Sequence, residues 1–213
     1  NLSTVSDDVV VDRRANRIEG KPFTKRLNQL ISLNGAAVTI LGTQGHRGIV
    51  VLQDPTYALS ADVTDTDPGD EGKPILKCRP RDKANPNACR TADLVNDLSE
   101  QALQILREEP AANSMLLRGF SENPSLRSLA DLHGLEALAI ADYPLYRGIA
   151  KMFGMTLCDP VPSLQDKVDQ FRENYASYTF FYIHYKTTDS KGEDKDFRGK
   201  VKALEDFDRV VPD

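Results

Sequence analysis

Three arginines lie close together near the start of the chain, in the segment Asp12-Arg13-Arg14-Ala15-Asn16-Arg17 that follows a run of valines. A guanidinium group can hold a carboxylate or a phosphate with two parallel hydrogen bonds, so this spacing favours an anion-binding site. Neighbouring side chains of an extended segment point to opposite faces, so Arg13 and Arg14 line one pocket only if a turn intervenes. The alternative is a charged sheet edge that prevents aggregation, and the residues alone leave both interpretations open.

A second candidate lies toward the C-terminus, where Lys186, Asp189 and Glu193 follow an apolar run in a glycine-containing loop. We expect that run, residues 178–185, to be a central strand covered on both sides, because both of its alternating faces are apolar or aromatic. Ligands usually bind at the carboxyl ends of such strands, and carboxylate oxygens suit Mg²⁺ or Mn²⁺. Two carboxylates are too few for a complete site, and a solvated acidic loop is the alternative.

Further basic residues fall at predicted turns and at the ends of predicted elements. His46 and Arg47 lie in a glycine-rich turn, Arg118 ends a strand, and Arg147 lies at the start of a helix, where the helix dipole also favours anions. The turn is not a nucleotide phosphate loop, because it lacks the Gly-Lys-Ser/Thr ending and a strand follows it. The alternatives are an exposed loop histidine, a strand-end charge and a tyrosine-rich packing corner. Because no histidine neighbours a nucleophile motif, the residues alone predict a phosphate- or carboxylate-ester-binding α/β domain.

The elements that must position these residues alternate between helices and strands, which is typical of an α/β protein with a mixed sheet flanked by helices. A long segment, residues 54–88, is rich in Asp, Pro, Gly and Asn, and we expect it to be a functional surface loop. Ser163 and Asp166 have the spacing of a capping box, which predicts that a helix begins there. The other expected elements are a strand at residues 9–11, a helix at 22–31, a hairpin of strands 37–41 and 48–53, a helix at 92–108 capped by Thr91, a strand at 114–118, a helix at 125–132, a strand at 136–141, a helix at 145–153, a strand at 155–157 and a final helix through Val201, Leu204 and Phe207.

Composition excludes several classes of protein. The chain has 213 residues, 27 Lys and Arg against 32 Asp and Glu, and a net charge of -5, so nonspecific nucleic-acid binding has no electrostatic support. Its three cysteines form no Cys-x-x-Cys pair, and it contains neither a membrane-spanning run nor a secretion signal, so we expect a cytoplasmic protein. The chain begins at Asn1 without a Met and stops at Asp213 directly after a helical pattern, which suggests a piece of a longer protein.

Five strings of residues, taken together and in this order, resemble one family. They are residues 12–18 (DRRANRI), 64–68 (TDTDP), 113–119 (NSMLLRG), 143–150 (YPLYRGIA) and 184–194 (HYKTTDSKGED). The chain resembles the archaeal-type cofactor-independent (2,3-bisphosphoglycerate-independent) phosphoglycerate mutases of the alkaline phosphatase superfamily, from near Asn1 to about Asp208.

The resemblance implies an enzyme of glycolysis and gluconeogenesis that interconverts 3-phosphoglycerate and 2-phosphoglycerate through a phosphoserine intermediate, with two Mn²⁺ or Mg²⁺ ions. It implies that residues 1–160 are the inserted substrate-binding (phosphotransferase) domain of an alkaline-phosphatase-like metalloenzyme, and that residues 161–213 are part of its metal-binding catalytic domain. The implied metal ligands are Asp189 and Glu193. The implied substrate-binding residues are Asp12, Arg13, Arg14, His46, Arg47, Asp65, Asp67, Arg118, Arg147 and Lys186.

The chain also departs from the family pattern. The amino-terminal metal-binding strand, the serine nucleophile and the carboxyl-terminal Asp-His and His ligands have no counterpart, and Glu193 stands where many superfamily members have His. We therefore expect the chain to lack mutase activity without the rest of its parent polypeptide, and to contain no catalytic residue of its own. The alternatives are a non-catalytic module that binds a phosphometabolite or a partner, and a related superfamily phosphatase or phosphonate hydrolase.

Overall fold

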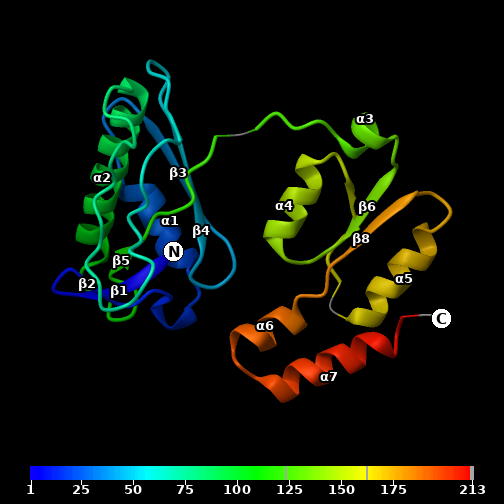
Figure 1. Ribbon diagram of the computed structural model, residues 1–213. Helices are drawn as coiled ribbons and strands as arrows, with labels where there is room; N and C mark the ends of the chain where they lie inside the picture. The colour runs from blue at the N-terminus through cyan, green and yellow to red at the C-terminus, as the bar shows by residue number, and fades with distance from the viewer. Residues whose placement is uncertain (123, 162, 212–213) are drawn as a thin grey trace. The chain divides into compact units, whose positions relative to one another are not determined.

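The computed structural model describes residues 1–122, 124–161 and 163–211, and the chain divides into two compact units, Asn1–Asn123 and Pro124–Asp213 (Figure 1). These two units are the parts of the chain that pack within themselves. The expected boundary between a substrate-binding domain and a catalytic domain, after residue 160, concerns function and stays a prediction.

The first unit combines antiparallel strands with two helices. A three-stranded antiparallel sheet has the order β2-β1-β5, and β3 and β4 form a separate hairpin. The elements are β1 (Leu2–Ser6), β2 (Val9–Asp12), the single turn η1 (Ala15–Arg17), α1 (Lys21–Leu30), β3 (Ala37–Gly42), β4 (Gly48–Gln53), α2 (Pro86–Leu106) and β5 (Ser114–Met115).

The predicted helix at 22–31 and the predicted hairpin are both confirmed. Pro22 lies in the first turn of α1, where its missing N–H costs nothing, and Leu27 is fully buried on the apolar face. The hairpin pairs Leu41 with Ile49 and packs against α1 so closely that a Cβ on Gly42 would lie 2.5 Å from the Thr24 hydroxyl. The local apolar period and the turn glycines therefore fix this part of the fold.

The predicted start of α2 was wrong. The helix begins at Pro86, not at residue 92, and its N-cap is Asn85, whose side chain accepts hydrogen bonds from the Asn87 and Ala88 amides. Asn followed by Pro combines a good capping side chain with a preferred first helical residue. Thr91 lies inside the helix, where its hydroxyl donates to the Asn87 carbonyl at 2.9 Å.

The segment at 54–85 has no helix or named strand, as expected of a loop, but much of it is packed against the rest of the unit. Val63, Thr66 and Cys78 are each at most 3 % exposed. The Thr66 amide donates to the Leu117 carbonyl at 2.8 Å, and the Cys78 amide donates to the Asn96 side chain at 2.9 Å. The loop is thus anchored to the segment directly after β5, which is shorter than the expected strand at 114–118, and to α2.

The second unit is a small parallel sheet with the strand order β7-β6-β8 and helices on its two faces. Its elements are α3 (Leu129–His133), β6 (Ala137–Ile140), α4 (Pro144–Met152), β7 (Thr156–Leu157), α5 (Leu164–Asn174), β8 (Phe180–Ile183), α6 (Thr187–Glu193) and α7 (Phe197–Asp208). The α/β class is confirmed, with antiparallel and parallel strands in separate sheets. The capping box of α5 is also confirmed, because Ser163 and Asp166 exchange hydrogen bonds.

The prediction that residues 178–185 form the central strand was wrong. The central strand is β6, all of whose residues are buried, whereas β8 lies at an edge of the described sheet, with Phe180 39 % exposed. The apolar pattern has a different cause. Phe181 packs edge-on against Phe171 of α5, while Phe180 and Tyr182 face the opposite side of the sheet.

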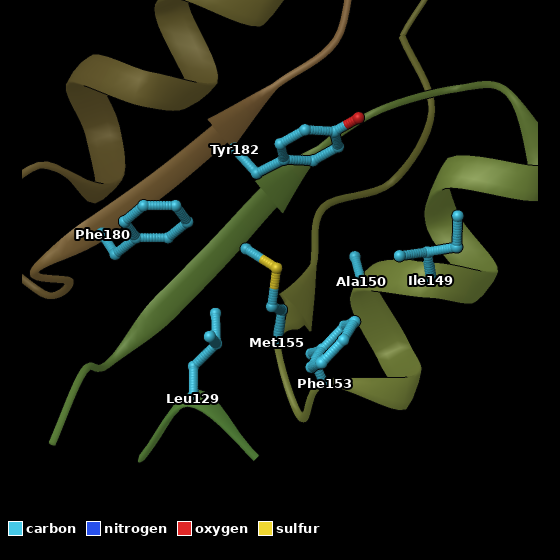
Figure 2. Close-up of a pocket in the computed structure, with 7 residues that line it drawn as sticks. All are labelled: Leu129, Ile149, Ala150, Phe153, Met155, Phe180 and Tyr182. Carbon is cyan, nitrogen blue, oxygen red and sulfur yellow. The ribbon is translucent and has the colours of Figure 1, made fainter. Parts of the chain in front are cut away.

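On that opposite side the structure has an apolar cavity of about 220 Å³ (Figure 2). It lies beside α4, with Phe180 and Tyr182 of β8 on its other side. Its remaining lining residues are Leu129, Ile149, Ala150, Phe153 and Met155.

The expected glycine-containing loop after β8 is also corrected, because residues 187–193 form the helix α6. A short polar run without an apolar period is typical of a loop, and this run contains Gly192. Here Lys186 forms an ion pair with Asp189 across the first turn, and the Ser190 amide donates to the Lys186 carbonyl at 3.0 Å. Asp189 and Glu193 consequently lie on a helix.

Candidate functional site

The first cluster of charges is built around Asp67, whose side chain is only 3 % exposed. Arg13 grips it with two hydrogen bonds, Nε to Oδ1 at 3.0 Å and Nη2 to Oδ2 at 2.7 Å, and Arg118 Nη1 lies 3.8 Å from Oδ2. Burial alone raises the pKa of Asp67, but hydrogen bonds from Arg13 and the Gly69 amide outweigh it and lower that pKa. Asp67 therefore holds the Arg13 side chain by hydrogen bonds. The Arg118 side chain is 57 % exposed, and at 3.8 Å its attraction to Asp67 is electrostatic.

A tight turn follows Arg13. The Asp12 carboxylate accepts hydrogen bonds from the Arg14 amide at 2.7 Å and the Asn16 amide at 2.6 Å. Ala15, Asn16 and Arg17 then all have positive φ angles, 46°, 51° and 55°. Both carboxylate oxygens of Asp12 are thus used by the backbone of the turn, so the contribution of Asp12 that the structure shows is to shape the loop that carries the arginines.

The turn between β3 and β4 brings His46 and Arg47 to this cluster. His46 is 8 % exposed, and its carbonyl accepts a hydrogen bond from the Leu2 amide at 2.8 Å. Burial first, and then the positive charges of Arg47 and Arg14 among others, lower the pKa of His46 to about 4. The imidazole is therefore neutral at pH 7, and its single ring N–H is the group that could donate to an anion.

Asp65 and Thr66 position the segment after β5 that carries Arg118. The Gly119 amide donates to Asp65 at 3.0 Å, and the Leu117 amide donates to the Thr66 hydroxyl at 2.8 Å. The two parts of the cluster meet at Asn1, whose amino group lies in the fields of Arg118, Asp67 and Arg47. The first unit thus brings together eight residues that the sequence singled out, namely Asp12, Arg13, Arg14, His46, Arg47, Asp65, Asp67 and Arg118.

Arg147 lies in the second unit, at the carboxyl edge of the parallel sheet. Its Nη1 donates to the Ala141 carbonyl at 2.9 Å and to the Cys158 carbonyl at 2.6 Å. These carbonyls follow β6 and β7, so the guanidinium links the ends of two strands. A contact between Arg147 and the substrate stays a prediction. The hydrogen bonds to the two carbonyls give the side chain a structural role as well.

Lys186, Asp189 and Glu193 gather at the start of α6 and along it. The Lys186 ammonium pairs with Asp189 and lies 5.3 Å from the centre of the Tyr143 ring. Asp189 and Glu193 are one helical turn apart and exposed, and their oxygens fit a hard divalent cation. Across the described ranges, no group of three or more His, Cys, Asp and Glu side chains is arranged to hold a metal ion. The pair can supply two ligands, and the others would have to come from outside these residues.

The sequence analysis missed a further charged pair at the same edge of the sheet. Lys167 of α5 has a side chain only 4 % exposed and pairs with Asp142, the second residue after β6. Asp142 was detectable as a carboxylate at a strand end, whereas Lys167 was hidden among the polar positions of an amphipathic helix. His184, the first residue after β8, lies against Tyr146 with 3.9 Å between ring centres and 30° between the ring planes.

Comparison with known proteins first gives the class. Residues 84–213 match the sequence profile of the metalloenzyme superfamily. The fold resembles the cofactor-independent phosphoglycerate mutase from Thermoplasma acidophilum, with a TM-score of 0.61, 24 % identity, and 96 % of this chain and 57 % of that chain covered. A protein from Pyrococcus horikoshii gives a TM-score of 0.65 at 16 % identity, over 99 % of this chain and 51 % of that one. This class of metalloenzyme has the alkaline-phosphatase-like fold expected from the sequence.

The family follows from the other half of the chain. Residues 1–112 match the profile of 2,3-bisphosphoglycerate-independent phosphoglycerate mutase. Curated relatives named as probable enzymes of that kind include one from Aquifex aeolicus, 39 % identical over 96 % of this chain and 51 % of the relative, and one from Thermus thermophilus, 40 % identical over 100 % and 53 %. The chain belongs to the 2,3-bisphosphoglycerate-independent phosphoglycerate mutase family. It spans about half the length of these relatives.

Proposed function

We propose that the chain is part of an enzyme that interconverts 3-phosphoglycerate and 2-phosphoglycerate through a phosphoserine intermediate. In this proposal the arginine cluster of the first unit binds the phosphate and carboxylate of the substrate, and the rest of the parent polypeptide supplies the serine nucleophile. The observation that carries the proposal is the convergence of Arg13 and Arg118 on the buried carboxylate of Asp67, beside the Asn1 amino group and His46, whose pKa values are also lowered by Arg47. Several guanidinium groups in one place suit a substrate with two anionic ends.

We propose Mn²⁺ or Mg²⁺ as the metal, with Asp189 and Glu193 as two of its ligands. Carboxylate oxygens on one exposed helical turn support a hard cation, which when bound would stabilise the charge of the transferring phosphoryl group. In the same proposal residues 1–160 form the inserted substrate-binding domain and residues 161–213 belong to the catalytic domain.

A cytoplasmic location is part of the proposal and is supported by the cysteines, all three of which are free thiols. None of the helices in the part of the chain that the structure describes combines the length and apolarity needed to cross a bilayer.

The test is a calorimetric titration of the chain with 3-phosphoglycerate in metal-free buffer, with sulfate and glycerate as reference ligands. Arg118→Ala removes an exposed guanidinium from the cluster. Arg107→Ala is the matched control, because the Arg107 side chain is 73 % exposed and pairs with the neighbouring Glu108. We expect binding that is tighter than sulfate and about tenfold weaker in Arg118→Ala, because a hydrogen bond to a charged group contributes about 1.5–3 kcal/mol. Binding no tighter than sulfate, or equal in both variants, would contradict the assignment of the cluster to substrate.

A coupled enolase assay with Mn²⁺ tests the division of labour. The chain alone should give no turnover, because it contains neither the serine nucleophile nor a complete metal site in this proposal. Turnover by the purified chain would show that its own residues suffice.

A further inference from the structure

Two short turns carry most of the basic side chains of the cluster in the first unit. We call residues 12–17 the first turn, which carries Arg13 and Arg14, and residues 43–47 the second turn, which carries His46 and Arg47. The Asp12 carboxylate closes the first turn by accepting hydrogen bonds from two amides of that turn. The Thr43 amide closes the second turn by donating to the Arg47 carbonyl at 2.9 Å. Each turn is thus held within itself, and other contacts must set the distance between the two.

Gly20, the third residue after the first turn, supplies one of those contacts. Its amide donates to the Gly45 carbonyl of the second turn at 2.9 Å. The Leu2 amide makes another contact, because it donates to the His46 carbonyl at 2.8 Å. The Arg17 carbonyl of the first turn is also near, since it would lie 3.9 Å from a Cβ on Gly45. The backbones that lead into the two turns therefore meet at Gly20 and Gly45.

Position 20 needs a glycine for space and not for backbone conformation. The φ of -81° and ψ of -15° at Gly20 are open to ordinary residues. A Cβ there would lie 2.7 Å from the Gly45 oxygen and 3.2 Å from Leu2 Cδ1. The first of these neighbours is backbone, which cannot rotate away as a side chain can, so the second turn would have to move. Ordinary contact begins at 3.4 Å, so the movement would be about 0.7 Å.

The contact at Gly20 sets the spacing of basic groups that lie close enough to influence one another. The positive charge of Arg14 on the first turn reaches the His46 imidazole on the second turn. Arg13 is held by hydrogen bonds to Asp67, so it does not follow a movement of the second turn. For a ligand with an anionic group at each end, the distance between the turns decides which length of ligand contacts both at once.

We propose that Gly20 is a specificity-determining positioning residue, which sets the distance between the two turns so that they hold the two anionic ends of a phosphorylated acid of the length of 3-phosphoglycerate. The proposal takes its ligand class from the proposed function and adds the residue that selects ligand length. In Gly20→Ala the second turn lies further from the first, so the preference moves toward a longer ligand. The competing explanation is that Gly20 serves packing alone, in which case its replacement lowers stability and leaves the length preference unchanged.

The test is a calorimetric titration of the chain with 2-phosphoglycolate, 3-phosphooxypropanoate and 4-phosphooxybutanoate, alongside 3-phosphoglycerate and sulfate. The first three ligands differ only by successive methylene groups between the phosphate ester and the carboxylate. We expect the native chain to bind 3-phosphooxypropanoate about tenfold more tightly than the shorter and the longer ligand, because each of these loses about one hydrogen bond to a charged group.

Variants assign that preference to Gly20. In Gly20→Ala the advantage of 3-phosphooxypropanoate over 4-phosphooxybutanoate should disappear, while 2-phosphoglycolate should bind more weakly still. If this variant fails to fold, adding Leu2→Val shortens the side chain that lies 3.2 Å from the new Cβ and keeps the contact with the Gly45 oxygen. Val95→Ala, a change at a fully buried residue of α2 in the same unit, is the control for lost stability and should leave the ratios of the Kd values unchanged.

The outcomes separate this inference from the proposed function. If 3-phosphoglycerate binds more tightly than sulfate but the native chain shows no preference among the three lengths, the role of Gly20 is wrong and the proposed function stands. The same conclusion follows if Gly20→Ala keeps the native ratios, or if Val95→Ala changes them in the same way. If no ligand binds more tightly than sulfate, both proposals fail for this chain.

Discussion

Replacing Asp67 with Asn should loosen the arginine cluster more than any equally small change on the same loop. The substitution keeps the shape of the side chain but removes the charge that receives two hydrogen bonds from Arg13. Breaking a buried ion pair costs about 3–5 kcal/mol, and because the Arg13 side chain is 27 % exposed we expect about 2–3 kcal/mol here. Asp70→Asn is the matched control, since Asp70 is 69 % exposed and pairs with Lys73, and it should leave the stability nearly unchanged.

Native-state hydrogen exchange is the suitable measurement, because a chain of two compact units need not unfold in one step. The Thr66 and Leu117 amides, which bond across the loop, should exchange about 30-fold to 150-fold faster in Asp67→Asn, the ratio that 2–3 kcal/mol implies. Amides of the second unit serve as the internal reference. Equal exchange in the Asp67 and Asp70 variants would refute the idea that Asp67 organises the cluster.

Three further predictions concern pH, capping and the sheet edge. The folded state lowers the pKa of Asp67, so its contribution to stability should be present above the unfolded value of about 4 and be lost as the pH falls through the lower folded pKa; acid titration of the Leu117 amide exchange checks this, and a flat profile contradicts it. Asn85→Ala should cost about 1 kcal/mol and speed exchange of the Ala88 amide, and no change there would mean that water caps α2 equally well. Arg147→Ala should lower the thermal midpoint of the second unit by removing two hydrogen bonds to carbonyls, about 1–3 kcal/mol, and an unchanged midpoint would leave substrate binding as its main role.

The sequence predicted the elements whose cause is local. The helix at 22–31 and the capping box at Ser163 depend on residues within one or two turns, and both were placed correctly. Strand β1 was not predicted as a strand, because its polar, extended run is defined by pairing with β2 and with β5, which lies more than 100 residues away. The prediction that β8 is the central strand was wrong for a related reason. Apolar residues on both faces of a strand indicate that both faces are covered, but they do not indicate whether the strand lies at the centre or the edge of the sheet.

The candidate site shows the same division. Arginine spacing pointed to the segment after β2, but the partner of Arg13 lies 54 residues away in a loop whose composition looked unstructured. That partner was singled out only through a family resemblance. The pair of Asp142 and Lys167 could not be found from either end, because a lysine in an amphipathic helix is usually solvated and its burial depends on the packing of α5 on the sheet.

The turn after Arg13 limits which sequences can display these arginines at all. Ala15 has a φ of 46° and is fully buried, so its site demands both an unusual backbone and a very small side chain. A β-branched or larger residue would meet strain and a lack of space at once, and only alanine and glycine satisfy both demands. We therefore expect other members of this family to have only alanine or glycine at position 15, even where the neighbouring exposed positions vary freely.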